Sequence, residues 1–346
     1  MNNYQLGQES TRLNLWALVL PGCFFLISLT ACESTLMREF NHHMSGNDQQ
    51  TAQRIVQQEL SRDGQNPEAN YLMGNLLSQQ KQYNEANIYF DRSLNRSSVY
   101  REHIRFLKER NFRMEFNRGV ELYQTNQFSG AAEHFELALQ IYPNHNEVFP
   151  QLGKIYEELG RNDDAETAYR SCIENDPSHL ECGLSLSSLL YENRRFEEAA
   201  QIAEQVSRHY PEDWRGYRLQ TDARLAARQF DRAETAFEEL YSRARSYRHI
   251  KHFALTLYNE REIRRAEPFL VRCLEQRPND PEVLQVLAGI YLDSGNYGLV
   301  IDAGNRVLNS DPNNNSIKAK MMIAYELLGD IDRFKEIKQE LGLREE

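Results

Sequence analysis

The sequence predicts an all-α protein built from stacked helix pairs, and three observations support that prediction. Glycine and proline are scarce, at 17 and 10 of 346 residues, whereas charged residues make up 26%, a composition that favours helix. The prolines recur 34 residues apart, with one slip of a residue in the series: Pro143, Pro177, Pro211, Pro278 and Pro312. A small residue lies twelve positions before each of them except the last. A fixed period of this length is typical of solenoids, whose units bury their apolar faces only against their neighbours.

Two sets of small residues and one set of large residues recur within each period. The small residues twelve positions before the proline register are Ala86, Ala131, Ala165, Ala199, Ala233 and Ala266. Those a further twelve positions upstream are Gly74, Gly119, Gly153, Ser187, Thr221, Ala254 and Ala288. Large rings follow at Phe90, Phe135, Tyr169 and Phe237. Small residues let two helix backbones approach closely while the rings fill the groove beside the crossing. Proline then ends the second helix, because it cannot continue the hydrogen-bond ladder.

This pattern resembles the tetratricopeptide repeat, a helix-turn-helix unit of 34 residues. The best copy matches the family's consensus residues at Gly153, Tyr156, Ala165, Tyr169 and Pro177. The resemblance implies a right-handed α-solenoid over residues 67–346. We count seven units, at 67–100, 112–145, 146–179, 180–213, 214–246, 247–280 and 281–314, followed by capping helices at 315–346. An insertion at 101–111 is expected to lengthen the helix that follows it, and residues 49–66 are expected to form an N-terminal capping helix.

The amino terminus carries the most specific short signal. An apolar stretch interrupted by Pro21-Gly22 ends in Leu29-Thr30-Ala31-Cys32, which resembles the bacterial lipobox. The resemblance implies a signal peptide at 1–31, diacylglycerol on the thiol of Cys32 and a flexible tether over 32–48. Glu33 follows the cysteine instead of the Asp that retains such proteins in the inner membrane. We therefore expect anchoring at the periplasmic face of the outer membrane of a Gram-negative cell; the alternative is an uncleaved signal anchor.

The sequence predicts a protein that is not an enzyme and needs no cofactor. The sequence contains no GxSxG, HExxH, P-loop or glycine-rich dinucleotide motif. His42-His43 and the pair His249 and His252 have no third ligand at a suitable spacing, so no metal site is expected. The net charge is −11, and loss of residues 1–31 removes one base and one acid and leaves it unchanged. A chain this acidic is a poor candidate for binding nucleic acid.

Three cysteines remain in the repeat region. Cys172 and Cys273 share one repeat position, where the family places alanine, so a small core residue is the simpler interpretation of each. Cys182 opens the helix that follows Pro177, which would place it opposite Cys172 across an antiparallel helix junction. In an oxidising compartment we expect a disulfide between Cys172 and Cys182.

In tetratricopeptide arrays the first helix of each unit lines a concave groove. Carrying over the family's groove positions gives these candidate partner-binding residues: Lys154, Tyr191, Arg215, Arg218, Arg248, Lys251 and Tyr258. Nine basic and four acidic residues lie between Tyr241 and Arg277, a local excess of positive charge in an acidic chain. Such a surface suits acidic peptide segments or an anionic glycan; the alternative is a solvated charge run without a partner.

The leading interpretation is therefore a lipid-anchored periplasmic scaffold that binds envelope proteins. Its layout resembles tetratricopeptide lipoproteins that assist pilus secretins, outer-membrane barrels or cell-wall hydrolases, and the sequence does not choose among these machines. A component of exopolysaccharide export, with an anionic polymer in the basic groove, is the alternative within the binding class. An enzyme subunit is the remote alternative.

Overall fold

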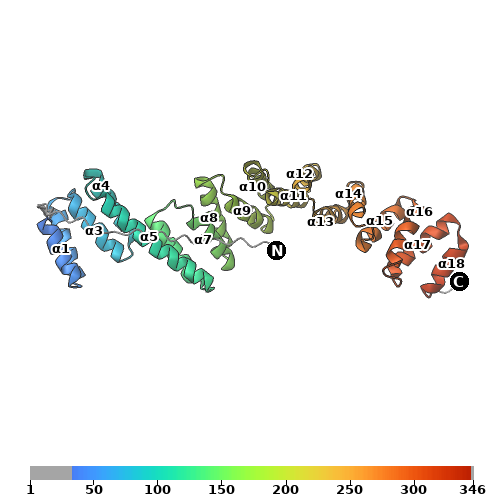
Figure 1. Cartoon of the computed structure of the whole chain (residues 1–346), viewed down its shortest axis with the longest axis horizontal. Coiled ribbons are helices and arrows are strands. Elements are labelled where there is room, and N and C mark those ends of the chain that lie inside the picture. Colours follow the sequence, from blue (N-terminus) through green and yellow to red (C-terminus); the bar gives the residue numbers. More distant parts are fainter. Residues whose placement is uncertain (1–32, 344–346) are drawn as a thin grey trace, which may run out of the picture. The chain divides into compact units, whose positions relative to one another are not determined.

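The structure is a computed structural model that describes residues 33–343, and these fold into helices joined by short turns (Figure 1). The described residues contain eighteen α-helices and no β-strand. They divide into two compact units, one ending at Ile104 and the other beginning at Arg105, which are taken separately below. None of the described helices is long and apolar enough to cross a membrane.

The first unit contains four complete helices and the start of a fifth. Their bounds are α1 (Thr35–Ser45), α2 (Gln49–Arg62), α3 (Pro67–Gln79), α4 (Tyr83–Arg96) and α5 (Arg101–Gln124), the last continuing into the second unit. α2 lies where the capping helix was predicted and buries Ala52 and Val56. α3 and α4 form the first repeat, in which a Cβ on Gly74 would lie 2.6 Å from the Phe90 ring.

The expectation of a flexible tether is wrong for residues 35–45, which form α1. Ser34 begins the helix, because its Oγ accepts a hydrogen bond from the Met37 N–H at 3.0 Å. The same hydroxyl donates to Glu68 Oε2 at 2.6 Å, which ties the start of α1 to α3. Phe40 is only 1% exposed. Burial of this ring stabilises the helix by about 2 kcal/mol, which a solvated tether would forgo.

The predicted lengthening of the helix at the 101–111 insertion is confirmed. α5 runs without interruption for 24 residues, whereas the other described helices have 10 to 14. No Gly or Pro interrupts its first half, and the helix continues past Gly119 in its second half to Gln124.

The second unit continues as helix pairs. Its helices are the rest of α5, then α6 (Phe128–Ile141), α7 (Val148–Glu158), α8 (Asn162–Asn175), α9 (Leu180–Glu192), α10 (Phe196–His209), α11 (Trp214–Ala226), α12 (Phe230–Arg243), α13 (Tyr247–Asn259), α14 (Ile263–Gln276), α15 (Pro281–Asp293), α16 (Tyr297–Leu308), α17 (Asn315–Leu328) and α18 (Ile331–Glu340). In the best copy, a Cβ on Gly153 would lie 2.3 Å from Tyr169 Cε1. Ala165, at the matching position of α8, is fully buried. The predicted small and large positions therefore meet at the helix crossing.

Candidate partner-binding groove

The first helices of three successive pairs enclose a cavity of about 530 Å³. We call it the first-helix cavity. It is lined from α9, α11, α12 and α13 by Tyr191, Trp214, Arg215, Arg218, Thr221, Asp222, Phe237, Leu240, Arg248, His249, His252 and Phe253. The repeat brings these residues together because α9, α11 and α13 occupy equivalent places in consecutive units, with α12 behind them.

The floor of the first-helix cavity is apolar and its rim is basic and aromatic. Phe237 and Phe253 stack with ring centroids 4.2 Å apart and are almost fully buried. At the rim, Trp214 and Tyr191 are 39% and 38% exposed, and the Trp214 ring lies 5.2 Å from that of His249. An apolar floor under exposed aromatic rings and cationic groups suits a side chain carried by an acidic segment.

One acidic side chain, Asp222, faces the basic groups of the cavity. Arg218 Nη1 lies 3.5 Å from Asp222 Oδ2, and His252 Nε2 lies 3.5 Å from Asp222 Oδ1. The hydrogen bond to Asp222 raises the pKa of His252, whereas burial lowers the pKa of His249. Arg248 is exposed, and its side chain forms no hydrogen bond or ion pair within residues 33–343. The cavity therefore keeps an unpaired cation at its rim.

Arg215 reaches the same cavity but is already held by two carboxylates. Its Nη2 lies 2.7 Å from Asp213 Oδ2 and its Nη1 lies 3.0 Å from Glu181 Oε1. The hydrogen bond from Arg215 lowers the pKa of Asp213, which also accepts the Arg215 N–H as the N-cap of α11. Arg215 thus orients the start of α11 and adds little free charge.

The structure brings four of the seven predicted groove residues into the first-helix cavity: Tyr191, Arg215, Arg218 and Arg248. Lys251 does not line it, because its Nζ binds Asp280 Oδ2 at 2.9 Å and Glu282 Oε2 at 2.7 Å. Lys251, predicted as a groove residue, is thus held in ion pairs and lies outside the first-helix cavity. Tyr258 packs against a core cluster that extends from α11 to α15, and Lys154 lies on α7, outside the cavity.

Trp214 is one of the lining residues that the sequence did not predict as part of the groove, together with His249, His252 and others. It is the first residue of its helix and of its unit, directly after the capping Asp213, and the family's groove positions do not include it. A large ring at the exposed start of a helix was the available signal.

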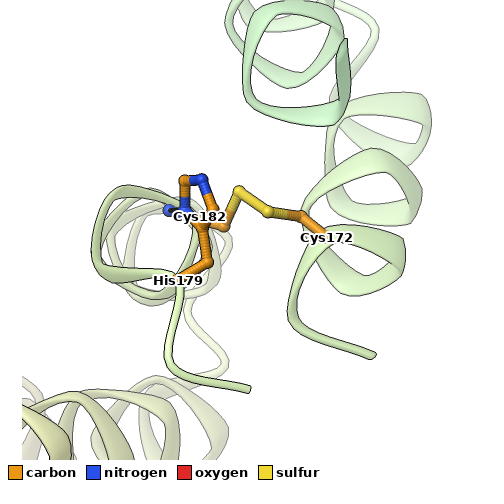
Figure 2. A group of neighbouring side chains, drawn as sticks. All are labelled: Cys172, His179 and Cys182. Carbon is orange, nitrogen blue, oxygen red and sulfur yellow. Dashed lines mark hydrogen bonds between the residues drawn. A yellow bond between two sulfur atoms is a disulfide. The ribbon is translucent and has the colours of Figure 1, made fainter. Parts of the chain in front are cut away.

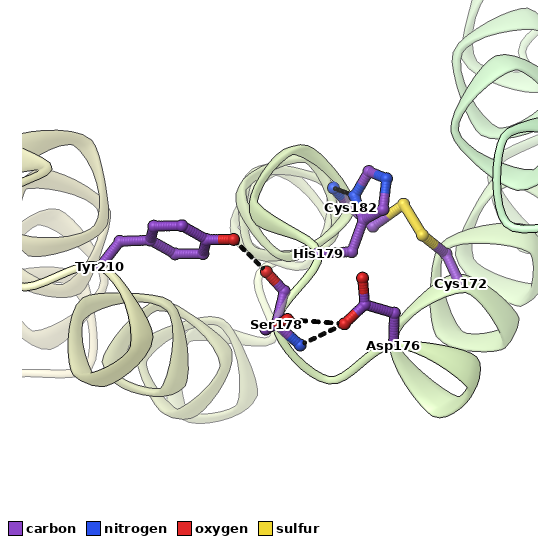
Figure 3. Close-up of a disulfide and its surroundings, with 6 residues drawn as sticks. All are labelled: Cys172, Asp176, Ser178, His179, Cys182 and Tyr210. Carbon is purple, nitrogen blue, oxygen red and sulfur yellow. Dashed lines mark hydrogen bonds between the residues drawn. A yellow bond between two sulfur atoms is a disulfide. The ribbon is translucent and has the colours of Figure 1, made fainter.

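A disulfide joins α8 to α9, the helix that contributes Tyr191 to the first-helix cavity. The Sγ atoms of Cys172 and Cys182, the predicted pair, are bonded, and both residues are fully buried (Figure 2). His179 caps α9, since its Nδ1 accepts the Cys182 N–H at 3.3 Å. In the same turn Asp176 accepts bonds from Ser178, and the Tyr210 hydroxyl donates to the Ser178 carbonyl at 2.6 Å (Figure 3). The α8–α9 turn is thus fixed by a covalent bond and by polar contacts.

The same turn contains one group of potential metal ligands. One ligand atom from each of Cys172, His179 and Cys182 lies within 4.8 Å of the others (Figure 2). The two sulfurs are bonded to each other, so the group in this form offers only the imidazole, whose Nδ1 already accepts a hydrogen bond. Its arrangement is that of a structural cross-link.

Family comparisons agree with the helix pairs. Tetratricopeptide repeat models match residues 67–99, 115–145 and 158–223. The chain therefore contains tetratricopeptide repeats, and proteins built from such repeats bind peptide or protein partners. It belongs with protein-interaction scaffolds.

Individual relatives resemble only parts of the chain. A peroxisomal targeting signal receptor from Yarrowia lipolytica is 34% identical over 100 residues, 28% of this chain and 17% of the receptor. Protein O-mannosyl-transferase Tmtc3 from Drosophila melanogaster is 26% identical over 163 residues, 46% of this chain and 16% of that protein. The chain thus spans less than a fifth of either relative. MamA from Desulfovibrio magneticus RS-1 aligns with a TM-score of 0.43 at 17% identity, covering 49% of this chain and 97% of MamA.

Proposed function

We propose that this protein is a lipid-anchored, non-enzymatic scaffold of the cell envelope that holds a partner protein in the first-helix cavity. The observation that supports this most is the cavity itself, with buried phenylalanines below exposed Trp214 and the cationic Arg218 and Arg248. The anchor is proposed from the lipobox-like sequence ending in Cys32, which lies outside the described residues. Pilus, outer-membrane and cell-wall machinery are the three settings in which such a scaffold would work.

The partner segment is expected to be acidic and to carry an apolar or aromatic side chain. Its carboxylates would meet Arg248 and Arg218, where a planar guanidinium can bind a carboxylate through two hydrogen bonds. Its apolar side chain would lie between Trp214 and Tyr191 above the stacked rings of Phe237 and Phe253. Burial of apolar surface would supply affinity, and the charges would supply orientation and a faster association.

Affinity capture of the tagged full-length lipoprotein from gently solubilised native envelopes tests this proposal. The test variant is the double charge reversal Arg218→Glu/Arg248→Glu. Lys251 is left unchanged, because it is paired with Asp280 and its reversal would perturb the fold. The matched control is Lys335→Glu, an exposed reversal on α18 far along the sequence. A partner that is lost in the double variant and retained in the control supports the proposal. Equal recovery by all three proteins would contradict it.

The anchor is tested separately through Cys32. Replacing Cys32 with Ser removes the thiol that would carry the diacylglycerol, so the protein should appear in the soluble periplasmic fraction or keep its signal uncut. Metabolic labelling with a palmitate analogue measures the modification directly. Membrane anchoring and labelling that persist in Cys32→Ser would refute the lipid anchor without affecting the proposal for the cavity.

A further inference from the structure

A second, larger cavity of about 840 Å³ lies between the second helices α10 and α12, with α11 behind it. We call it the second-helix cavity. Its lining residues that matter here are Glu204, Arg208, Tyr217, Arg224, Arg232 and Arg243. α11 therefore lines two cavities with two of its faces: residues 217, 220 and 224 face this one, and residues 214, 218 and 222 face the other.

Arg224 is a departure from the repeat. The equivalent position holds a large apolar or aromatic residue in the other units, among them Tyr156, Leu190 and Leu257. In the third unit, the Tyr156 hydroxyl donates to Glu136 Oε1 at 2.8 Å, twenty residues upstream. Arg224 Nη2 donates to Glu204 Oε2 at 2.9 Å, also twenty residues upstream. The arginine thus occupies the tyrosine's place and adds a buried cation beside the cavity.

The Arg224 guanidinium is not fully satisfied. The residue is 7% exposed, and its Nη1 binds Gln229 Oε1 at 2.5 Å. Its Nε has no hydrogen-bond partner among the described residues. An unpaired buried donor on a charged group is costly, and this Nε has almost no accessible surface, so a ligand in the cavity would bind the remaining N–H groups of Nη1 and Nη2. The repeat itself calls for no charge at this position, and here the charge is held by Glu204 and Gln229 beside the cavity.

The cavity carries more positive than negative charge. Four arginines line it against two glutamates, Glu204 and Glu239. Arg208 binds Glu204 at 2.5 Å and Arg243 binds Glu239 at 2.5 Å, whereas Arg232 is exposed and has a 3.4 Å contact to the neutral Gln229. An excess of two positive charges in a chain of net charge −11 favours an anionic ligand.

The rest of the lining favours a saccharide over a peptide. Gln201 and Gln220 contribute side-chain amides, and Ser207 and Thr235 contribute hydroxyl oxygens that can accept hydrogen bonds. Tyr217 supplies one aromatic ring, with the Arg243 guanidinium 4.2 Å from its centroid. Hydroxyl-rich sugars match amides and hydroxyls, whereas the stacked phenylalanines that would receive an apolar peptide side chain line the first-helix cavity.

We infer that the second-helix cavity binds an acidic saccharide, with its carboxylates on Arg224 and Arg232 and its hydroxyls on the glutamine amides. This site is separate from the partner site of the proposed function, so the protein can hold a protein segment and a polyuronate-type glycan at once. The sequence predicts an anionic glycan, as the alternative ligand, in the groove lined by the first helices. The inferred glycan site lies instead between the second helices α10 and α12.

The test is isothermal titration of the purified full-length chain with tetragalacturonate, with neutral galactotetraose and tetraglutamate as comparison ligands. Arg224→Tyr restores the residue of the third unit and should fold, and Arg232→Gln removes the exposed cation. Each should weaken tetragalacturonate binding by about tenfold or more, as expected for loss of one charge-assisted hydrogen bond. Arg248→Gln, in the first-helix cavity, is the matched control and should leave the affinity unchanged.

The outcomes separate the possibilities. Binding of tetragalacturonate alone, weakened by Arg224→Tyr and Arg232→Gln, supports the inference. Equal binding of galactotetraose would overturn the role of charge, and equal binding of tetraglutamate would overturn the saccharide. Absence of tetragalacturonate binding, or weakening only by Arg248→Gln, would also overturn it, while leaving the partner proposal in place.

Discussion

Removal of the Cys172–Cys182 bond should weaken one junction of the solenoid by a predictable amount. The bond closes a loop with a sequence separation of 10 residues. The chain-entropy model gives about 2.5–3 kcal/mol for a loop of this size. Since every 1.4 kcal/mol is a factor of ten, the separation of α8 from α9 should become about a hundredfold more frequent. Both cysteines are buried, so alanine replaces them with little loss of packing beyond the sulfur atoms.

Hydrogen exchange measures this effect locally, which is needed because repeat arrays unfold in parts. In Cys172→Ala/Cys182→Ala, amides of 162–192 should exchange about a hundredfold faster, and those of α15 and α16 should be unchanged. Cys273→Ala, which removes a buried free cysteine from the same repeat position, is the control. Under strong reductant the wild type should approach the double variant. Wild-type protection of 162–192 in the double variant would refute the claim that the bond stabilises this junction.

Three further predictions concern stability. Gly153→Ala should lower the free energy of unfolding by about 1–3 kcal/mol in urea titrations, because its Cβ would overlap Tyr169. Gly298→Ala, whose Cβ would have no atom within 4 Å, should leave the free energy of unfolding unchanged or raise it. Equal effects of the two variants would contradict the packing argument. Lys251→Glu should cost about 1–3 kcal/mol in the same assay, since it leaves Asp280 without its cation, and an unchanged midpoint would show that the pair is dispensable. The bond from Arg215 holds the pKa of Asp213 below the unfolded value, so Asp213 should stabilise the fold above about pH 4 and lose this contribution as pH falls through the lower folded pKa. In Asp213→Asn, the free energy of unfolding should therefore depend less on pH in this acid range. An acid unfolding profile identical to that of the wild type would contradict the prediction.

The repeat pattern predicts most of the fold because it is a local signal. Small residues at Gly153 and Ala165 and a ring at Tyr169 fix one helix pair, and the period places the next. The helix α1 escaped prediction because its stability depends on distant residues. Ser34 reaches Glu68, and Phe40 is buried by tertiary packing that the composition of residues 33–48 does not reveal.

The sequence predicted where several residues of the candidate site lie, but not which of its charged side chains are paired. The repeat register identifies Tyr191, Arg218 and Arg248 as groove residues, since equivalent helices line one face. It does not reveal that Lys251 is neutralised by Asp280, 29 residues away in the next unit's cap. The departure at Arg224 was visible in the sequence as a charge at an apolar register position, although its buried, unpaired Nε and the cavity beside it required the structure.

Site-specific photo-crosslinking in native envelopes tests the central claim most directly. A benzoylphenylalanine at Trp214, at the rim of the first-helix cavity, is compared with one at Phe334 on α18. The account predicts one discrete partner crosslinked from position 214, through an acidic segment identified by peptide mapping, and its loss when Arg248→Glu is added. Crosslinks that are absent at 214, equal at both positions or insensitive to Arg248→Glu would contradict the account.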